Sequence, residues 1–220
     1  FDDGSGPALY AGGAFTSIGE DNHAHIARWD GQTWSNVGDG LNGEVRCFAI
    51  FDDGDGPALY AGGYFTASGK EQVSRIARWD GTQWQPLGAG VNAAVLTMTV
   101  FDDGRNGPAI YVGGWLSVAG TVNASHIARW DGEEWSEVGG GVNQPVAAMT
   151  VADLGAGEAL YIGGAFYQAG SIYAPRLARW DGSSWSAPPT GPNSVIYTLA
   201  TMDDGHGPAV YAGGPFTFVD

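Results

Sequence analysis

The chain has 220 residues, with 24 acidic side chains against 9 basic ones, and its formal net charge is −15. Such a surface repels duplex nucleic acid and anionic membranes, so we expect no nucleic-acid partner. The sequence has no apolar run as long as a transmembrane helix, so we expect no membrane insertion. The 37 glycines and the 12% aromatic content favour short strands joined by tight turns over helices.

A repeat of about fifty residues runs through the whole chain. It combines an Ala-x-Tyr-x-Gly-Gly block, an Ile-Ala-Arg-Trp-Asp-Gly block, a second Trp and an Asn. The repeated positions are Tyr10, Tyr60, Tyr111, Tyr161 and Tyr211; Trp29, Trp79, Trp130 and Trp180; Trp34, Trp84, Trp135 and Trp185; and Asn42, Asn92, Asn143 and Asn193. We divide the chain into units 1 to 5, which are residues 1–43, 44–93, 94–144, 145–194 and 195–220, the first and last being incomplete.

The first complete unit predicts four strands. Strand a covers residues 45–51 and leads into an acidic, glycine-rich turn that a proline ends. Strand b covers 58–62 and strand c covers 75–79, where Asp-Gly marks a hairpin. Strand d covers 83–87. No segment has helical periodicity with caps.

Four short antiparallel strands in about fifty residues are what a propeller blade needs. The sequence therefore predicts an all-β chain forming one repeat domain, residues 1–220, a β-propeller of four-stranded antiparallel blades. Small and β-branched residues on strand a predict that this strand lies near the axis, and the two Trp of each unit are expected to fill the wider gap between outer strands. The strand count fits no small ring, which favours part of a larger propeller or array.

The order of Gly12-Gly13, Trp29-Asp30 and Trp34 resembles kelch-type repeats. The Gly-Gly-x-Phe-Thr and Ile-Ala-Arg-Trp-Asp-Gly blocks are more similar to a bacterial, often secreted variant, and related repeats occur in the delta-60 family. The resemblance covers the whole chain and implies a propeller at the bacterial cell surface or outside the cell. It says little about activity, because propellers host many unrelated functions.

Binding specificity is expected where the copies differ, on loops carried by a rigid scaffold. The residue after Gly-Gly and the connection between strands b and c both vary. Tyr64, Trp115 and Tyr173 are aromatic residues at such positions and are the candidate binding residues. Drift on a solvated loop is the alternative interpretation.

The acidic turns offer a weaker candidate, a calcium site formed by Asp52, Asp53 and Asp55. Calcium requires six to eight oxygen ligands, so a simple hairpin turn is the favoured interpretation and no cofactor is expected. The Arg repeated at Arg28, Arg78, Arg129 and Arg179 is expected to pair with a turn Asp. The lone Cys47 is expected to pack as a small hydrophobe.

Three functions remain open from the sequence. The first is a non-catalytic extracellular or surface propeller that serves as a binding or structural scaffold for a protein partner or for self-association. The second is a carbohydrate-binding, lectin-like propeller. The third is a fragment of a kelch-scaffold enzyme whose site lies outside this segment. The first is favoured, because the sequence contains no recognisable catalytic motif.

Overall fold

The computed structural model of the chain describes residues 1–105 and 107–218 and is all-β, with no helix among those residues. Unit 1 contains β1 (Leu9–Gly12), β2 (Ser17–Ile18), β3 (Asp21–Asn22), β4 (Ile26–Trp29) and β5 (Trp34–Asn36). Unit 2 contains β6 (Val45–Asp52), β7 (Pro57–Gly63), β8 (Ala67–Ser68), β9 (Glu71–Gln72), β10 (Ile76–Trp79) and β11 (Trp84–Pro86).

Unit 3 contains β12 (Val95–Asp102), β13 (Pro108–Gly114), β14 (Val118–Ala119), β15 (Val122–Asn123), β16 (Ile127–Trp130) and β17 (Trp135–Glu137). Unit 4 contains β18 (Val146–Asp153), β19 (Glu158–Gly164), β20 (Gln168–Ala169), β21 (Ile172–Tyr173), β22 (Leu177–Trp180) and β23 (Trp185–Ser186). Unit 5 contains β24 (Thr198–Asp203) and β25 (Pro208–Gly213).

Units 2, 3 and 4 each form one four-stranded antiparallel sheet in the order a, b, c, d, as predicted. Unit 1 forms the three-stranded sheet β1-β4-β5, and unit 5 forms the hairpin β24-β25. The predicted strand bounds differ from the observed ones by only one or two residues. The connection between strands b and c forms a small hairpin, such as β8-β9, that the sequence did not predict, because each of its strands has only two residues.

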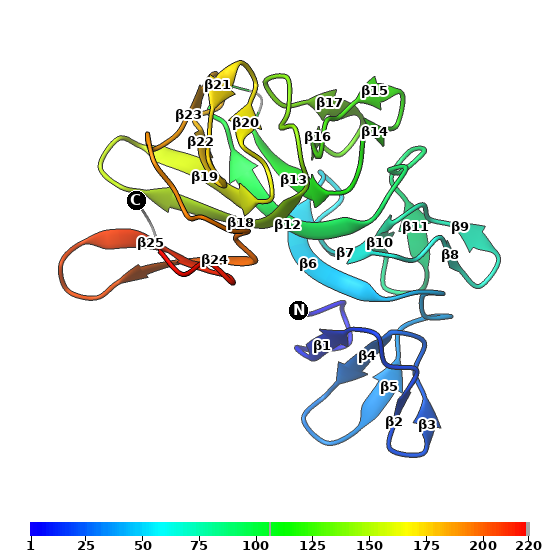
Figure 1. Cartoon of the computed structure of the whole chain (residues 1–220). Helices are drawn as coiled ribbons and strands as arrows, with labels where there is room; N and C mark the ends of the chain where they lie inside the picture. Colours follow the sequence, from blue (N-terminus) through cyan, green and yellow to red (C-terminus); the bar gives the residue numbers. More distant parts are fainter. Residues whose placement is uncertain (106, 219–220) are drawn as a thin grey trace.

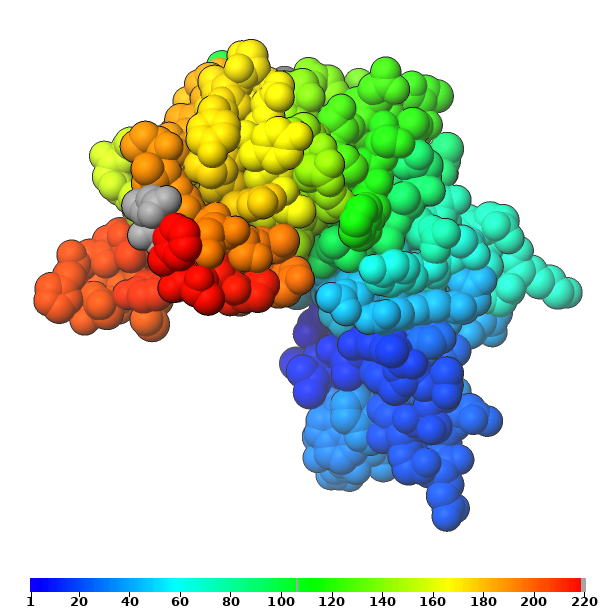
Figure 2. Space-filling model, in the orientation of Figure 1, coloured from blue at the N-terminus to red at the C-terminus, as the bar shows by residue number. Residues whose placement is uncertain are grey.

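The sheets follow one another along an open arc (Figure 1), with a gap between unit 1 and the β24-β25 hairpin. The a strands lie on the inside of this arc: β12 packs between β6 and β18, and β18 packs against β24. The space-filling view shows the same gap as an open notch between the two ends of the chain (Figure 2). Repeated sheets in contact with their neighbours are thus the basic architecture.

The Gly-Gly block permits two close approaches of the backbone. A Cβ at Gly62 would lie 2.5 Å from Met98 Cε and 2.6 Å from Val95 Cγ1, both on strand a of the next unit. A Cβ at Gly63 would collide with the carbonyl oxygen of Glu44, which precedes strand a of the same unit. Equivalent pairs of close contacts occur at Gly113 and Gly114 and at Gly163 and Gly164.

These contacts correct one expectation about strand a. Small side chains were expected along it, yet Phe48, Met98 and Met149 stand at equivalent positions and reach across to a glycine of the preceding unit. The room that the large residues need is provided by the missing Cβ on strand b. Strand a is therefore not uniformly small, and the fit depends on pairing a large residue with a glycine.

In units 2, 3 and 4, the two Trp fill the outer part of the interface with the preceding sheet, as predicted. Trp79 and Trp84 face each other across β10 and β11 with ring centroids 5.3 Å apart, and both are buried. The Trp84 indole Nε1–H donates to the carbonyl of Val37 in unit 1 at 3.2 Å. The same bond joins Trp135 to Leu87 and Trp185 to Gly139, so this ring links each sheet to the preceding one.

One buried polar residue breaks the repeat. His23 is 2% exposed, and neither ring nitrogen has a hydrogen-bond partner among the described residues. Units 2, 3 and 4 carry Val73, Ala124 and Ala174 at this position, all buried. Because burying an unsatisfied polar group is costly, the histidine is expected to destabilise unit 1.

We therefore expect His23→Val to raise the free energy of unfolding by about 1–2 kcal/mol. Urea denaturation followed by tryptophan fluorescence measures this change. The reciprocal variant, Val73→His, is the matched control and is expected to lower it. A loss of stability in His23→Val would mean that the imidazole has a favourable partner in solution.

Candidate functional site

The antiparallel order of the strands gives the array two faces. The turn face carries the a–b and c–d hairpin turns, and the loop face carries the b–c connections and the segments that lead from strand d to the next strand a. Repeated acidic turns gather on the turn face. The variable residues Tyr64, Trp115 and Tyr173 belong to the loop face.

On the turn face, the second Asp of each a–b turn is the centre of a polar cluster. In unit 2, Asp53 Oδ2 accepts from the Tyr60 hydroxyl at 2.8 Å and lies 2.7 Å from Arg78 Nε. Tyr60 and Arg78 are cross-strand neighbours on β7 and β10, which explains their constant spacing in the sequence. Burial would raise the pKa of Asp53, but the Tyr60 hydrogen bond and the Arg78 charge outweigh it and hold this pKa below its usual value.

The same cluster recurs with small variations. In unit 1, Asp3 accepts from Tyr10, with Arg28 Nε at 4.0 Å. In unit 3, Asp103 accepts from Tyr111, and Arg129 Nε lies 3.8 Å away. The expectation that these arginines pair with a turn Asp is thus confirmed in three units.

Unit 4 lacks the cluster because Leu154 replaces the Asp. Its arginine, Arg179, lies 3.9 Å from Asp181 on its own c–d turn and 3.5 Å from the carbonyl of Ala156. Leu154 is 42% exposed. Comparing unit 4 with the other units therefore shows what this carboxylate contributes to stability.

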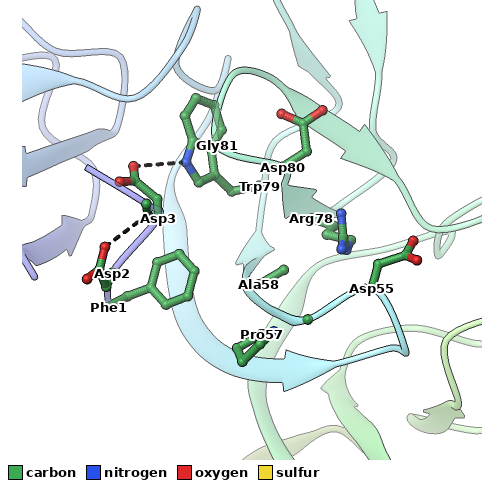
Figure 3. Close-up of a pocket in the computed structure, with 12 residues that line it drawn as sticks. Phe1, Asp2, Asp3, Asp55, Pro57, Ala58, Arg78, Trp79, Asp80 and Gly81 are labelled. Carbon is green, nitrogen blue, oxygen red and sulfur yellow. Dashed lines mark hydrogen bonds between the residues drawn. The ribbon is translucent and has the colours of Figure 1, made fainter. Parts of the chain in front are cut away.

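The acidic turn of one unit also contacts the next unit. Trp79 Nε1–H of unit 2 donates to Asp3 Oδ2 of unit 1 at 3.4 Å, and Figure 3 shows the two side chains facing each other. A Cβ at Gly132 would lie 3.1 Å from the Asp53 Cβ, and Gly182 meets Asp103 in the same way. The Trp-Asp-Gly motif thus provides an indole donor and a glycine on which the preceding turn rests.

Between units 1 and 2 this arrangement forms a half-open pocket of about 240 Å³. The carboxylates of Asp2, Asp55 and Asp80 lie around it but point apart (Figure 3). Two of these carboxylates are already engaged in their own turns. Asp2 accepts from the backbone amides of its a–b turn, and Asp80 accepts from the backbone amides of the c–d turn that follows it. The pocket has no convergent set of ligands.

The three calcium candidates have separate roles in the structure. Asp52 Oδ1 accepts from the Gly54 and Gly56 amides and shapes the turn, whereas Asp53 is paired with Arg78. Asp55 is exposed. Within residues 1–105 and 107–218, no group of three His, Cys, Asp or Glu side chains is arranged to hold a metal ion. These contacts favour the hairpin-turn interpretation.

The clusters predict acid sensitivity. Burial would raise the pKa of Asp3, but hydrogen bonds from Ser5, Tyr10 and Trp79 lower it to about 2. A lowered pKa contributes stability above the unfolded carboxyl pKa of about 4, and this contribution is lost as the pH falls through the folded value. We expect a nearly constant urea midpoint from about pH 7 to 5 and a steep decline between about pH 4 and 2. Asp3→Asn is expected to flatten part of that decline, and an unchanged slope would contradict the assignment.

On the loop face, the repeated Asn joins consecutive units. Asn92 Oδ1 accepts from the amides of Ser117 and Val118 in unit 3, at 2.9 and 3.0 Å. Asn42 and Asn143 each accept from two equivalent amides of the following unit, and Asn193 accepts from the amide of Thr217. This residue holds the start of the next b–c connection.

The basic residue before strand c is also structural. His25, Arg75, His126 and Arg176 all have positive φ, between 64° and 73°. His126 Nδ1 lies 3.2 Å from the carbonyl of Gly114, and His25 makes the same contact with Gly13. The longer arginine reaches one residue further: Arg75 donates to the carbonyl of Tyr64, and Arg176 donates to that of Ala165. The alternation of His and Arg therefore preserves one contact with the strand b end.

Cys47 lies on strand a, where its sulfur is 3.8 Å from the carbonyl of Gly62. Desolvation raises the pKa of the thiol, which keeps it protonated at neutral pH. These features fit the predicted packing role.

The candidate aromatic residues are exposed and divide into two groups. Tyr64 and Trp115 are 42% and 57% exposed and hold the same position, directly after Gly-Gly, in the adjacent units 2 and 3. Tyr173 is 68% exposed but lies on the β20-β21 hairpin of unit 4. The structure thus brings two of the three to equivalent places and leaves the third apart.

Four exposed aromatic residues were not among the candidates: Tyr167, Tyr197, Tyr211 and Phe218. Tyr167 follows Phe166, where the other units carry Thr or Ser, and Tyr197 directly precedes β24. Tyr197 holds the position of Arg46 in unit 2, where Arg46 Nη1 pairs with Glu44 at 2.9 Å. Comparing the copies residue by residue at the positions of Tyr167 and Tyr197 would have found both.

Comparison of the chain with family models, with curated proteins and with solved structures finds no match. The described part of the chain contains no helix that is long and apolar enough to cross a membrane.

Proposed function

We propose that the chain is a kelch-like propeller segment that acts as a non-catalytic scaffold, with a partner-binding surface on its loop face. The observation that carries this proposal is that the repeated side chains make structural contacts, whereas exposed aromatic side chains stand at variable positions. The repeated Asp, Tyr, Arg, Trp and Asn side chains are engaged in contacts within and between units. The exposed Tyr64 and Trp115 vary between copies and donate no hydrogen bond from their side chains among the described contacts.

In this proposal the four-stranded sheets are propeller blades, and the open arc is part of a larger propeller or array. The inner position of the a strands and the packing of each sheet on the next support it. An extracellular or cell-surface setting in a bacterium is part of the proposal and rests on the kelch-like and delta-60-like resemblance alone.

The proposal is tested by separating stability from binding. The double variant Tyr64→Ala, Trp115→Ala is expected to keep its melting temperature within about 2 °C, because exposed substitutions cost little. A large loss of stability would show that these side chains support the fold instead. Hydrolase, lyase or oxidase turnover by the purified chain, abolished by a substitution in this chain, would overturn the non-catalytic assignment.

A further inference from the structure

The strongest unexplained feature is the aromatic part of the loop face. Trp115 is 57% exposed and Tyr64 is 42% exposed, although large aromatic side chains are usually well covered. At the same position, units 1, 4 and 5 carry Ala14, Ala165 and Pro215. The aromatic pair is therefore confined to units 2 and 3, and the repeat does not require it.

These two residues are held on rigid backbone. The Tyr64 amide donates to Glu44 at 2.8 Å and the Trp115 amide donates to Ala94 at 3.0 Å, each just before strand a of its own unit. Strands β6 and β12 pack against each other, so the two anchor points belong to neighbouring inner strands. Because the backbone at both aromatic residues is fixed, less conformational freedom is lost on binding, which favours affinity.

Two arginine side chains and one carboxylate lie near Tyr64. The guanidinium of Arg46 is half exposed and pairs with Glu44, so the nearest carboxylate is neutralised. Arg75 turns its side chain onto the Tyr64 carbonyl. The acidic a–b turns lie on the opposite face of the array, and the surface at Tyr64 and Trp115 presents flat rings with guanidinium donors beside Tyr64.

A sugar ring matches this combination. The C–H groups on one side of a pyranose carry slight positive charge and pack against the negative face of an aromatic ring, while the hydroxyls at its edge accept from guanidinium groups. A polyanion is disfavoured by the net charge of −15. A strongly cationic partner would be drawn to the acidic turn face instead.

We propose that Tyr64 and Trp115, with Arg46 beside Tyr64, form a binding site for a neutral oligosaccharide that spans units 2 and 3. This inference rests on the proposed scaffold function and specifies the partner. One sugar ring lies against each aromatic side chain, and Arg46 donates to hydroxyl oxygens near Tyr64. Tyr173, on a different unit and on an outer hairpin, takes no part.

The test is a calorimetric titration of the 220-residue chain with neutral pentasaccharides made of glucose, mannose, xylose and N-acetylglucosamine. At least one is expected to bind, and Trp115→Ala is expected to weaken it about ten- to a hundredfold, as removal of a stacking partner does for other stacked rings. Tyr64→Ala is expected to weaken it as well. Tyr173→Ala removes another exposed aromatic side chain, so it is the matched control and is expected to leave the affinity unchanged.

Three outcomes would overturn the inference: no binding at about 10 mM sugar, binding that survives Trp115→Ala, or binding only of a uronic-acid oligomer or a peptide. The melting temperature of each variant is measured alongside, so that lost binding is not confused with lost structure. Failure to bind sugar, with the melting temperatures unchanged, would remove the oligosaccharide site and leave the scaffold proposal standing.

Discussion

Trp84→Ala is expected to lower the free energy of unfolding by about 3–5 kcal/mol, the usual cost of removing a fully buried large aromatic ring. The Trp84 side chain is 0% exposed, packs against Trp79 and donates to the Val37 carbonyl of the preceding unit. The variant leaves a cavity between two sheets and removes the indole donor from the Val37 carbonyl, which keeps only the Gly40 amide. Urea denaturation followed by far-UV circular dichroism measures the loss.

Trp34→Ala provides a matched control. Trp34 holds the same place in unit 1 and packs against Trp29 at 5.3 Å, but it is only half-buried and has no preceding sheet among the described residues. We expect it to cost less than half as much as Trp84→Ala. Equal losses would mean that the ring stabilises its own sheet and that the contact between units contributes little.

The repeat made most of the fold predictable. Antiparallel strands with hairpin turns follow from the spacing of Tyr, Trp and Asp-Gly, and the four complete sets of markers place almost every long strand correctly. The pairing of Arg78 with a turn Asp could also be predicted from the sequence, because an Arg and an Asp that recur together in each copy are expected to form an ion pair.

Contacts between units were harder to predict from the sequence. Nothing local shows that Met98 needs the missing Cβ of Gly62, or that Asn92 binds the backbone of the following unit, because these partners are 36 and about 25 residues apart. The exposure of Trp115 could be predicted because its position varies between the copies. That Tyr173 lies apart from Trp115 could be seen only from the arrangement of the sheets. Sequence position thus identified surface residues but not which of them share a surface.

Asp53→Leu is the second substitution with a large expected effect, about 2–4 kcal/mol of destabilisation. It removes the acceptor of the fully buried Tyr60 and the partner of Arg78, leaving a hydroxyl and a guanidinium unpaired in a partly buried site. Breaking such a pair costs more than the pair itself contributes, because the remaining charge stays desolvated. Thermal and urea unfolding of the variant measure the loss.

Unit 4 supplies the reciprocal experiment, because it already carries Leu154 at this position. Leu154→Asp places a carboxylate beside Tyr161 and Arg179, which are cross-strand neighbours like Tyr60 and Arg78. We expect a gain of about 0.5–1.5 kcal/mol, smaller than the loss in unit 2, because Arg179 is already near Asp181. If Asp53→Leu is costly and Leu154→Asp is favourable, the carboxylate is the stabilising centre of each turn. If both changes are neutral, the repeated Asp, Tyr and Arg are held together by the packing of their strands, and their charges contribute little to stability.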